Sequence, residues 1–172
     1  EHGNIYWTLQ TDAIAVPTDI VNKWGDLKWE NGDLGYPVAE ATEHNGGLVQ
    51  KFQNGYVTRN PKGANNWVRG AIAAKYGELQ TAKSKLGYPT SDEKSINGGA
   101  FQEFENGNIY WSPATGAHVI YYGDIYKAWG EKGYEQGEYG YPTSDQESAS
   151  GSITFQGGKM SQSNGKVREE RN

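Results

Sequence analysis

Acidic residues recur in pairs that could act as the acid and the nucleophile of a glycosidase. Asp92 is followed directly by Glu93, and Asp145 is followed two residues later by Glu147. Both pairs stand just after the same Tyr-Pro motif, about one repeat length apart. A catalytic pair belongs to one asymmetric cleft, so it would not be copied with a repeat. We therefore interpret these carboxylates as turn caps or as hydrogen-bond partners between repeats.

Exposed aromatic side chains beside polar loops suit sugar binding, because the apolar faces of sugar rings stack on aromatic rings and their hydroxyls need polar partners. The chain repeats itself with a period of about 52 residues, so residues at equivalent positions form columns. Two neighbouring columns change between aromatic and polar residues: Trp7, Arg59, Trp111 and Gln162, and Tyr6, Thr58, Tyr110 and Ser161. A position that tolerates arginine or glutamine is not an obligate core position. We predict that carbohydrate is bound by Trp111, Tyr110, Trp7 and Tyr6. The alternative is that these rings only pack at the rims between repeats.

Two further residues are second-rank candidates for the same carbohydrate site. Trp67 aligns with Ile120, and His118 aligns with Asn65, if the loop at 113–116 carries a one-residue insertion. A single loop histidine is also common as an ordinary surface residue that forms hydrogen bonds.

The sequence argues against several other kinds of chemistry. It has no cysteine, which excludes disulfides, thiolate zinc sites and cysteine nucleophiles. Phosphate-binding, nucleophile-elbow and HExxH motifs do not occur, and the histidines lack metal-ligand spacing. The net charge of −5 leaves no basic footprint for nucleic acid. No apolar run approaches the ~20 residues that cross a bilayer. We expect no catalytic residue, cofactor, metal, nucleic-acid partner or membrane insertion.

An internal repeat organises the chain. Leu-Gly-Tyr-Pro occurs at 34–37 and 86–89, and Tyr-Gly-Tyr-Pro at 139–142, a period of about 52 residues. Three columns keep this period: Phe52, Phe104 and Phe155; Ile20, Ile72 and Ile125; Trp24, Tyr76 and Trp129. Columns that keep their chemistry are expected to form the core. We predict one domain, 1–172, with units at approximately 2–53, 54–105 and 106–156 and a partial fourth unit at 157–172.

Each unit is predicted to contain a β-hairpin and a short helix. Asn-Gly pairs beginning at Asn54 and Asn106 are strong hairpin signals. Gly25, Gly77 and Gly130 follow the aromatic column, where a left-handed helix C-cap belongs. Helices of about two turns are stable only when packed, so neighbouring units must share a core. The predicted fold class is α+β, with tandem repeats in an open arc or a partial ring.

The first predicted strand, Gly3 to Trp7, lacks the partner strand that its repeat equivalents have. An unpaired strand edge is a site of association. We expect this edge to pair with a lost repeat, with the C-terminal segment, or with another molecule by self-association through the N-terminal strand.

These motifs resemble the LGFP repeat, a family found in secreted cell-wall proteins of mycolic-acid-containing actinobacteria, often attached to mycoloyltransferases and peptidoglycan amidases. The resemblance rests on LGYPTSDE at 86–93 and GGAFQEFENGNIYWSPATGAH at 98–118, and it covers nearly the whole chain. It implies a tandem array with propeller-like pseudo-rotational symmetry, secreted and associated with the cell wall, that binds a polysaccharide such as arabinogalactan or peptidoglycan. The first unit departs from the pattern with LGYPVAEATE at 34–43, so the units need not bind equally.

Three functions follow as hypotheses. The first is a non-catalytic module that anchors its owner to cell-wall glycan through several weak sites acting together. The second is a protein-interaction or inhibitor module that uses the same aromatic rim. The third is a glycan-processing enzyme, which is least favoured because no asymmetric catalytic constellation is visible.

Overall fold

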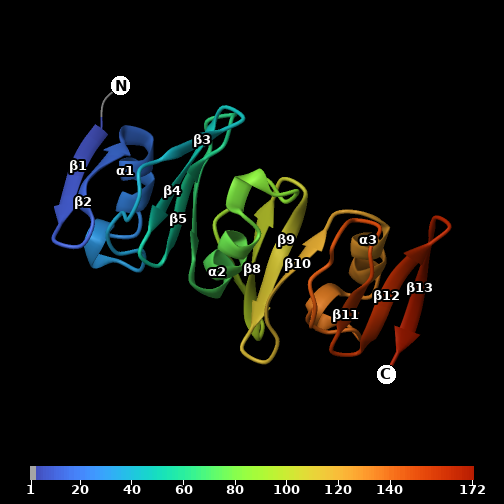
Figure 1. The fold of residues 1–172 in the computed structure, drawn as a ribbon. Helices are drawn as coiled ribbons and strands as arrows, with labels where there is room; N and C mark the ends of the chain where they lie inside the picture. The colour runs from blue at the N-terminus through green and yellow to red at the C-terminus, as the bar shows by residue number, and fades with distance from the viewer. Residues whose placement is uncertain (1–2) are drawn as a thin grey trace.

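The computed structural model describes residues 3–172 and shows four small antiparallel β-sheets separated by three helices (Figure 1). Residue 2, where the first unit was predicted to begin, lies outside the described residues. The first sheet is the hairpin of β1 (Gly3–Thr8) and β2 (Asp12–Pro17). The second sheet has the order β3 (Thr42–His44), β4 (Gly47–Phe52), β5 (Gly55–Arg59) and β6 (Asn65–Arg69).

The third and fourth sheets repeat the second. The third sheet consists of β7 (Lys94–Ile96), β8 (Gly99–Phe104), β9 (Gly107–Ser112) and β10 (Gly116–Tyr121). The fourth has only β11 (Ile153–Phe155), β12 (Gly158–Ser163) and β13 (Lys166–Arg171). It is narrower because the sequence between the third Tyr-Pro corner and Phe155 is two residues shorter than in the preceding unit. The second, third and fourth sheets each cross the boundary between two of the predicted sequence units, whereas the first sheet lies within the first unit.

Each helix lies between two successive sheets. The helices are α1 (Thr18–Gly25), α2 (Gly70–Glu78) and α3 (Asp124–Glu131), each followed by one 3-10 turn: η1 (Trp29–Asn31), η2 (Thr81–Lys83) and η3 (Tyr134–Gln136). Helix α1 contacts β1 and β2 on one side and β5 and β6 on the other, and α2 contacts β5, β6, β9 and β10 in the same way. Helices of eight or nine residues gain their stability from this packing.

One large aromatic ring forms the centre of each core. Trp24, Tyr76 and Trp129 are fully buried, and each lies about 5 Å, centroid to centroid, from the phenylalanine of the next hairpin. The isoleucine four residues earlier in each helix is buried on the same face. The predicted core columns are confirmed.

Both faces of the inner sheets are buried. In β9, Ile109 belongs to the core around Tyr76, whereas its neighbour Tyr110 belongs to the core around Trp129. Successive residues of a strand point to opposite faces, so each hairpin contributes to two cores at once. The hairpins of the second and third sheets therefore lack the polar, solvent-exposed face that antiparallel sheets commonly have.

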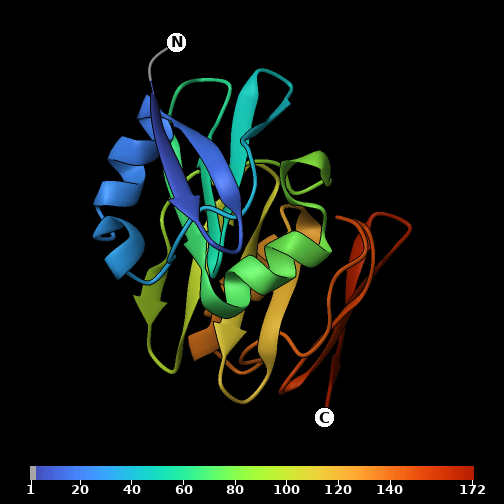
Figure 2. The same cartoon turned by 60° about the vertical axis from the view of Figure 1, so that its left-hand side comes forward.

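The array is open. The four sheets follow one another along the molecule, and the two ends of the chain lie at opposite ends in both views (Figures 1 and 2). The predicted α+β class, with open tandem repeats of a hairpin and a short helix, is confirmed.

The prediction for the helix C-caps was wrong. Gly25, Gly77 and Gly130 lie inside the helices, and the left-handed residues come three positions later, at Lys28, Gln80 and Gly133. The helical glycines are needed for close approach instead. A Cβ at Gly130 would lie 2.7 Å from the ring of Tyr134, and one at Gly77 would lie 2.5 Å from the Tyr56 hydroxyl.

The one-residue insertion also lies elsewhere than expected. Gly55 pairs with Arg69, and Gly107 pairs with Tyr121, so the two hairpin loops have equal length. The extra residue falls between β10 and α3, at Tyr122. Trp67 is consequently equivalent to Val119, and His118 to Asn66 rather than Asn65. The hydrogen bonds agree with this alignment. Asn66 and Trp67 both bond to Asp92, and His118 and Val119 both bond to Asp145, and each aspartate follows the next Tyr-Pro corner.

Those carboxylates join successive repeats. Asp92 accepts hydrogen bonds from Lys23 Nζ (2.6 Å), from the Asn66 side chain and from the Trp67 backbone N–H. One repeat later, Asp145 is bonded in the same way to Lys75 Nζ (2.9 Å), to His118 and to the Val119 N–H. The structural interpretation of Asp92 and Asp145 is confirmed.

At these joints between repeats, burial and neighbouring charges have opposite effects on the pKa of each ionisable side chain. Burial alone would raise the pKa of Asp145, but the hydrogen bonds from Lys75, the Val119 N–H and His118 outweigh it and hold the pKa below its usual range. Burial alone would lower the pKa of Lys75, but Glu78 and Asp145 raise it. Both partners are therefore ionised at neutral pH.

Further hydrogen bonds, which are partly buried, complete each joint. The Tyr88 hydroxyl donates to the His44 carbonyl (2.6 Å), and the Tyr141 hydroxyl donates to the Asn97 carbonyl (2.8 Å), in each case 44 residues back along the chain. Gln102 Nε2 donates to the carbonyls of Trp67 and Ser91, as Gln50 Nε2 does to the equivalent carbonyls one repeat earlier.

The hydrogen bonds of the Tyr88 and Tyr141 hydroxyls predict that removal of either hydroxyl lowers the stability of the fold. We expect Tyr88→Phe and Tyr141→Phe each to lower the free energy of unfolding by about 1 kcal/mol, because each leaves a carbonyl without its donor. Tyr36→Phe is the matched control, since the hydroxyl of this tyrosine has no hydrogen-bond partner among residues 3–172. Urea denaturation measures the three values. Equal effects in all three variants would contradict the assignment.

The carboxylate joint predicts a dependence of stability on pH. The pKa of Asp145 is lowered in the folded protein, so its contribution is present above the unfolded value of ~3.9 and is lost as the pH falls through the lower folded value. We expect Asp145→Asn to cost about 1 kcal/mol at pH 7 and to flatten the loss of stability below pH ~4. Glu131→Gln, an exposed residue without an ion-pair partner among residues 3–172, should leave the profile unchanged.

Candidate functional site

The six predicted carbohydrate-binding residues do not form one site. Trp111 is half-buried and lines a cavity, whereas Tyr110 is only 4% exposed. The Tyr110 ring stacks on Phe101 (5.1 Å) and meets Trp129 edge-on (4.9 Å). Burial raises the pKa of Tyr110 and keeps its hydroxyl neutral. The expectation that Tyr110 is exposed was wrong, because the hairpin is covered on both faces.

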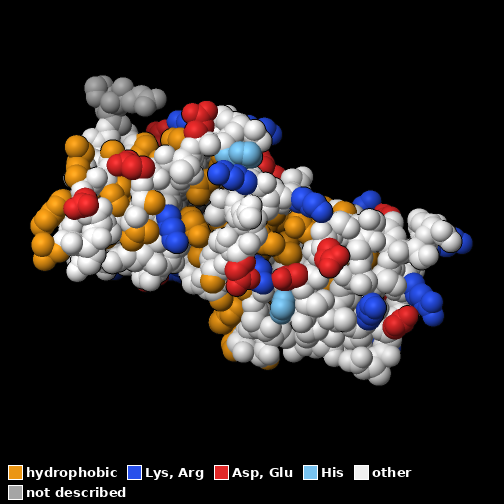
Figure 3. Space-filling model, in the orientation of Figure 1, with side chains coloured by type: hydrophobic (Ala, Val, Ile, Leu, Met, Phe, Trp, Pro, Cys, Tyr) orange, Lys and Arg blue, Asp and Glu red, His pale blue; other side chains and the backbone are white. Residues whose placement is uncertain are grey.

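Trp7 and Tyr6 lie at the N-terminal end of the array. Trp7 is 61% exposed on the outer face of β1, beside Ile5 and Leu9. Tyr6 points to the other face and packs edge-on against Trp24, with ring centroids 4.8 Å apart. Neither residue lines a cavity with Trp111. In the orientation of Figure 3, hydrophobic side chains gather at this end of the molecule.

Trp67 and His118 have supporting positions. The Trp67 ring lies beneath the guanidinium of Arg69, whose Cζ is 4.7 Å from the ring centroid. Both ring nitrogens of His118 are engaged, one with Asp145 (3.1 Å) and the other with the Thr115 carbonyl (2.9 Å). His118 is therefore part of a joint between repeats.

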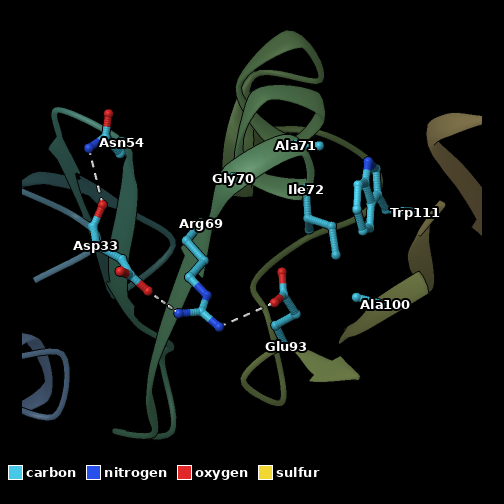
Figure 4. A pocket seen from close by; sticks show the side chains of 9 residues that line it. All are labelled: Asp33, Asn54, Arg69, Gly70, Ala71, Ile72, Glu93, Ala100 and Trp111. Atoms are coloured by element: carbon cyan, nitrogen blue, oxygen red, sulfur yellow. Dashed lines mark hydrogen bonds and ion pairs between the residues drawn. The ribbon is translucent and has the colours of Figure 1, made fainter. Parts of the chain in front are cut away.

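A cavity of about 380 Å³ surrounds the exposed side of Trp111. Its lining is drawn in Figure 4 and comprises Asp33, Asn54, Arg69, Gly70, Ala71, Ile72, Glu93, Ala100 and Trp111. A second hollow of about 490 Å³ adjoins it and shares Asn54 and Gly70. The two together give an extended, open depression along one side of the array.

Each wall of this cavity, the first junction cavity, is placed by a different element. Arg69 is the last residue of β6, and Gly70, with a φ of +59°, turns the chain into α2. Asp33 stands just before the first Leu-Gly-Tyr-Pro corner and Glu93 just after the second. Trp111 comes from β9, one repeat further on.

The charged side chains of the first junction cavity are linked by two ion pairs that share Arg69. Arg69 bonds to Asp33 through Nη1 and to Glu93 through Nη2, the latter at 3.5 Å. In Figure 4, Glu93 and Ile72 lie between Arg69 and the indole of Trp111. A guanidinium has five N–H donors, so donors remain for a ligand, and both carboxylates can accept from hydroxyls. Polar groups of both kinds thus stand beside an aromatic ring and an apolar floor.

The repeat builds a second cavity at the equivalent place one unit later. This second junction cavity, of about 280 Å³, is lined by Lys85, Asn106, Tyr121, Tyr122, Ser148 and Ala149. The hydrogen bond from Asn54 Nδ2 to the Asp33 carbonyl (3.1 Å) recurs as that from Asn106 Nδ2 to the Lys85 carbonyl (2.9 Å). The backbone frame is conserved between the two cavities, and the side chains differ.

Sequence reasoning missed Arg69 and Asp33, and it assigned Glu93 a structural role only. A signal was available, because the column that contains Asp33 continues with Lys85 and Glu138, and Arg69 is replaced by Tyr121 one unit later. These columns change their chemistry as much as the aromatic ones do. Arg69 ends β6, and Asp33 and Glu93 lie in the segments beside the Leu-Gly-Tyr-Pro corners, whereas the predicted site residues all lie within strands.

Residues 3–172 contain neither a metal-binding cluster nor a membrane-spanning helix. In this part of the chain, no group of three or more His, Asp or Glu side chains could hold a metal ion. Its helices are also too short and too polar to span a membrane.

Comparison with known proteins identifies the repeat. The family model described as the LGFP repeat matches residues 1–32, 34–84 and 86–137, which together span most of the chain. No curated protein matches the sequence. The matched boundaries fall at the Leu-Gly-Tyr-Pro corners, as do the structural joints. The chain therefore belongs to the LGFP repeat family.

Proposed function

We propose that this chain is a non-catalytic module that binds cell-wall polysaccharide, arabinogalactan or peptidoglycan, in a secreted protein associated with the cell wall. The observation that carries the proposal is the first junction cavity, where the indole of Trp111 stands beside the chain of Asp33, Arg69 and Glu93. The family resemblance supports the cell-wall setting, and the cavity supports a sugar as the ligand.

The chemistry of the first junction cavity suits a sugar. An indole face takes the apolar face of a pyranose or furanose ring, and carboxylates and guanidinium N–H groups bond its hydroxyls. The cavity volume lies at the small end of the ~300–1,000 Å³ typical of ligand sites. One such site binds weakly, so useful affinity requires several contacts along a polymer.

Recognition fits this cavity better than catalysis. Asp33 and Glu93 both bond to Arg69. In a glycosidase the two carboxyl groups flank the scissile bond, whereas here the Arg69 guanidinium lies between Asp33 and Glu93 (Figure 4). The two carboxylates are therefore assigned to hydrogen bonding of hydroxyl groups.

A second candidate function is association with another protein through the N-terminal hairpin. Ile5 is 75% exposed, whereas the residues of the same column in the later repeats, Val57, Ile109 and Met160, are fully buried. Ile5, Trp7 and Leu9 thus present an apolar surface of the kind that marks an interface.

A second copy of the chain is the partner we propose for this hairpin. Among the described residues, β1 pairs only with β2, whereas its equivalent β5 pairs with both β4 and β6. Two copies can pair their β1 edges antiparallel about a two-fold axis, which would give a four-stranded sheet like the inner two. Because successive residues of a strand alternate between faces, this pairing brings Ile5 and Trp7 of the two copies together on one face of the shared sheet.

The glycan proposal predicts the effect of Trp111→Ala. We expect it to weaken binding to purified actinobacterial cell wall by roughly threefold to tenfold, because it removes the stacking surface. Arg69→Gln is a second variant that leaves the core in place. Trp29→Ala, at an exposed tryptophan outside the cavity and outside the N-terminal hairpin, is the control and should bind as the wild type does. Sedimentation with insoluble wall measures retention, and soluble arabinogalactan and peptidoglycan fragments compete. Absence of retention, or equal retention of all variants, contradicts the proposal.

The association proposal predicts a dimer that Trp7→Asp converts to a monomer, because like charges of the two copies would then lie close together on one face of the shared sheet. Trp29→Asp introduces the same charge at an exposed tryptophan outside the hairpin and should leave the dimer intact. Sedimentation equilibrium over a concentration series reports the mass. A wild type that is monomeric throughout, or equal effects of the two variants, overturns this assignment.

A further inference from the structure

The second junction cavity has the same frame as the first and the opposite charge. In the first, Arg69 is bonded to two carboxylates, Asp33 and Glu93. In the second, Asp33 is replaced by Lys85, and no Asp or Glu belongs to the lining. The only charged side chain of this lining is therefore a cation.

Lys85 has no ion-pair partner among residues 3–172. Its Nζ contacts only a backbone carbonyl, that of Glu147, at 3.5 Å. By contrast, Lys23 and Lys75, which occupy a different position of the repeat, are each held by two carboxylates. An exposed ammonium without a counter-charge, at the mouth of a cavity, suits an anionic group of a ligand.

Two departures from the repeat pattern meet at this cavity. Tyr122 is the residue inserted between β10 and α3, and Ser148 and Ala149 belong to the shortened segment after the third Tyr-Pro corner. These segments touch, since a Cβ at Gly123 would lie 3.0 Å from the Ala149 carbonyl oxygen. The cavity is thus rebuilt locally while the cores on either side keep their residues.

Tyr122 supplies a fixed aromatic surface. Its hydroxyl donates to Asn108 Oδ1 (2.7 Å), its ring meets Tyr126 at 5.1 Å, and the residue is still 40% exposed. Burial, with the neighbouring Tyr126, raises the pKa of Tyr122 to about 12, so the hydroxyl stays neutral at physiological pH. The hydroxyl of Ser148 adds a donor and an acceptor to the lining.

We infer that the second junction cavity binds a sugar unit that carries a negatively charged substituent, a carboxylate or a phosphate. Lys85 pairs with the anionic group, the Tyr122 ring contacts the sugar face, and Ser148 bonds a hydroxyl. This inference rests on the proposed function and deepens it. The first junction cavity, which contains two carboxylates, would take neutral sugar units, and the second would take acidic ones.

The test is an NMR titration of the full chain with three small probes: methyl β-glucuronide, glucose 1-phosphate and methyl β-glucoside. We expect at least one acidic probe to shift the amide signals of Tyr122, Ser148 and Ala149 in a saturable way, with the neutral glucoside roughly threefold to fivefold weaker. The two acidic probes distinguish a carboxylate from a phosphate. Equal binding of the neutral and acidic probes, or no shift of these signals, overturns the inference.

Matched lysine variants test whether Lys85 is the cation that pairs with the acidic probe. Lys85→Gln should weaken the acidic probe by roughly threefold to fivefold, and Lys83→Gln, which removes the same charge from an exposed neighbour outside the lining, should not. Tyr122→Ala should weaken the acidic and neutral probes together. Equal effects of the two lysine variants would overturn the role of Lys85.

The failure of this inference can be told apart from the failure of the proposed function. If retention on the cell wall depends on Trp111 but the acidic probes do not bind in the second junction cavity, only the inference is overturned. Binding of acidic probes at Tyr122 without any wall retention supports the charged site and contradicts the cell-wall function.

Discussion

The structure depends on the enclosure of one large aromatic ring per helix between two successive sheets. Trp24, Tyr76 and Trp129 sit on helices of only eight or nine residues, which are too short to persist alone. Each ring is covered on one side by the hairpin before its helix and on the other by the hairpin after it. A single repeat therefore has no complete core, and the free energy of folding arises at the contacts between neighbours. This is why the sheets, and not the sequence units, are the continuous elements of the array.

The polar joints explain which surface positions can change. Asp92 and Asp145, with Lys23 and Lys75, hold successive repeats in one orientation, and Gln50 and Gln102 satisfy carbonyls that the stacking buries. Removal of one partner at such a joint would leave the other without its hydrogen bond, which is costly. The positions beside these joints, at the corners and at the ends of the hairpins, differ in chemistry from unit to unit: Asp33 is replaced by Lys85, and Arg69 by Tyr121. The two junction cavities lie at these positions.

The internal repeat was enough to predict the core, the α+β class and the structural role of Asp92 and Asp145, because these features recur in every unit and the chain aligns with itself. It was not enough to predict exposure. Tyr110 and Thr58 belong to a column of changing chemistry and yet are buried, since both faces of an inner hairpin are covered. It also could not place the insertion at Tyr122, because only strand register distinguishes a longer loop from a longer strand-to-helix connection. The first junction cavity was missed because its residues are far apart in sequence.

That distance in sequence links the fold to the proposed function. Asp33 comes from the first predicted unit, Arg69 and Glu93 from the second, and Trp111 from the third. The cavity exists only when three successive units are stacked, so an isolated repeat would lack it. The same stacking fixes the distance between the two junction cavities. A polymer whose units match that spacing engages both without the entropy cost of ordering a flexible linker, which favours polysaccharide over its monomers even where each cavity binds weakly.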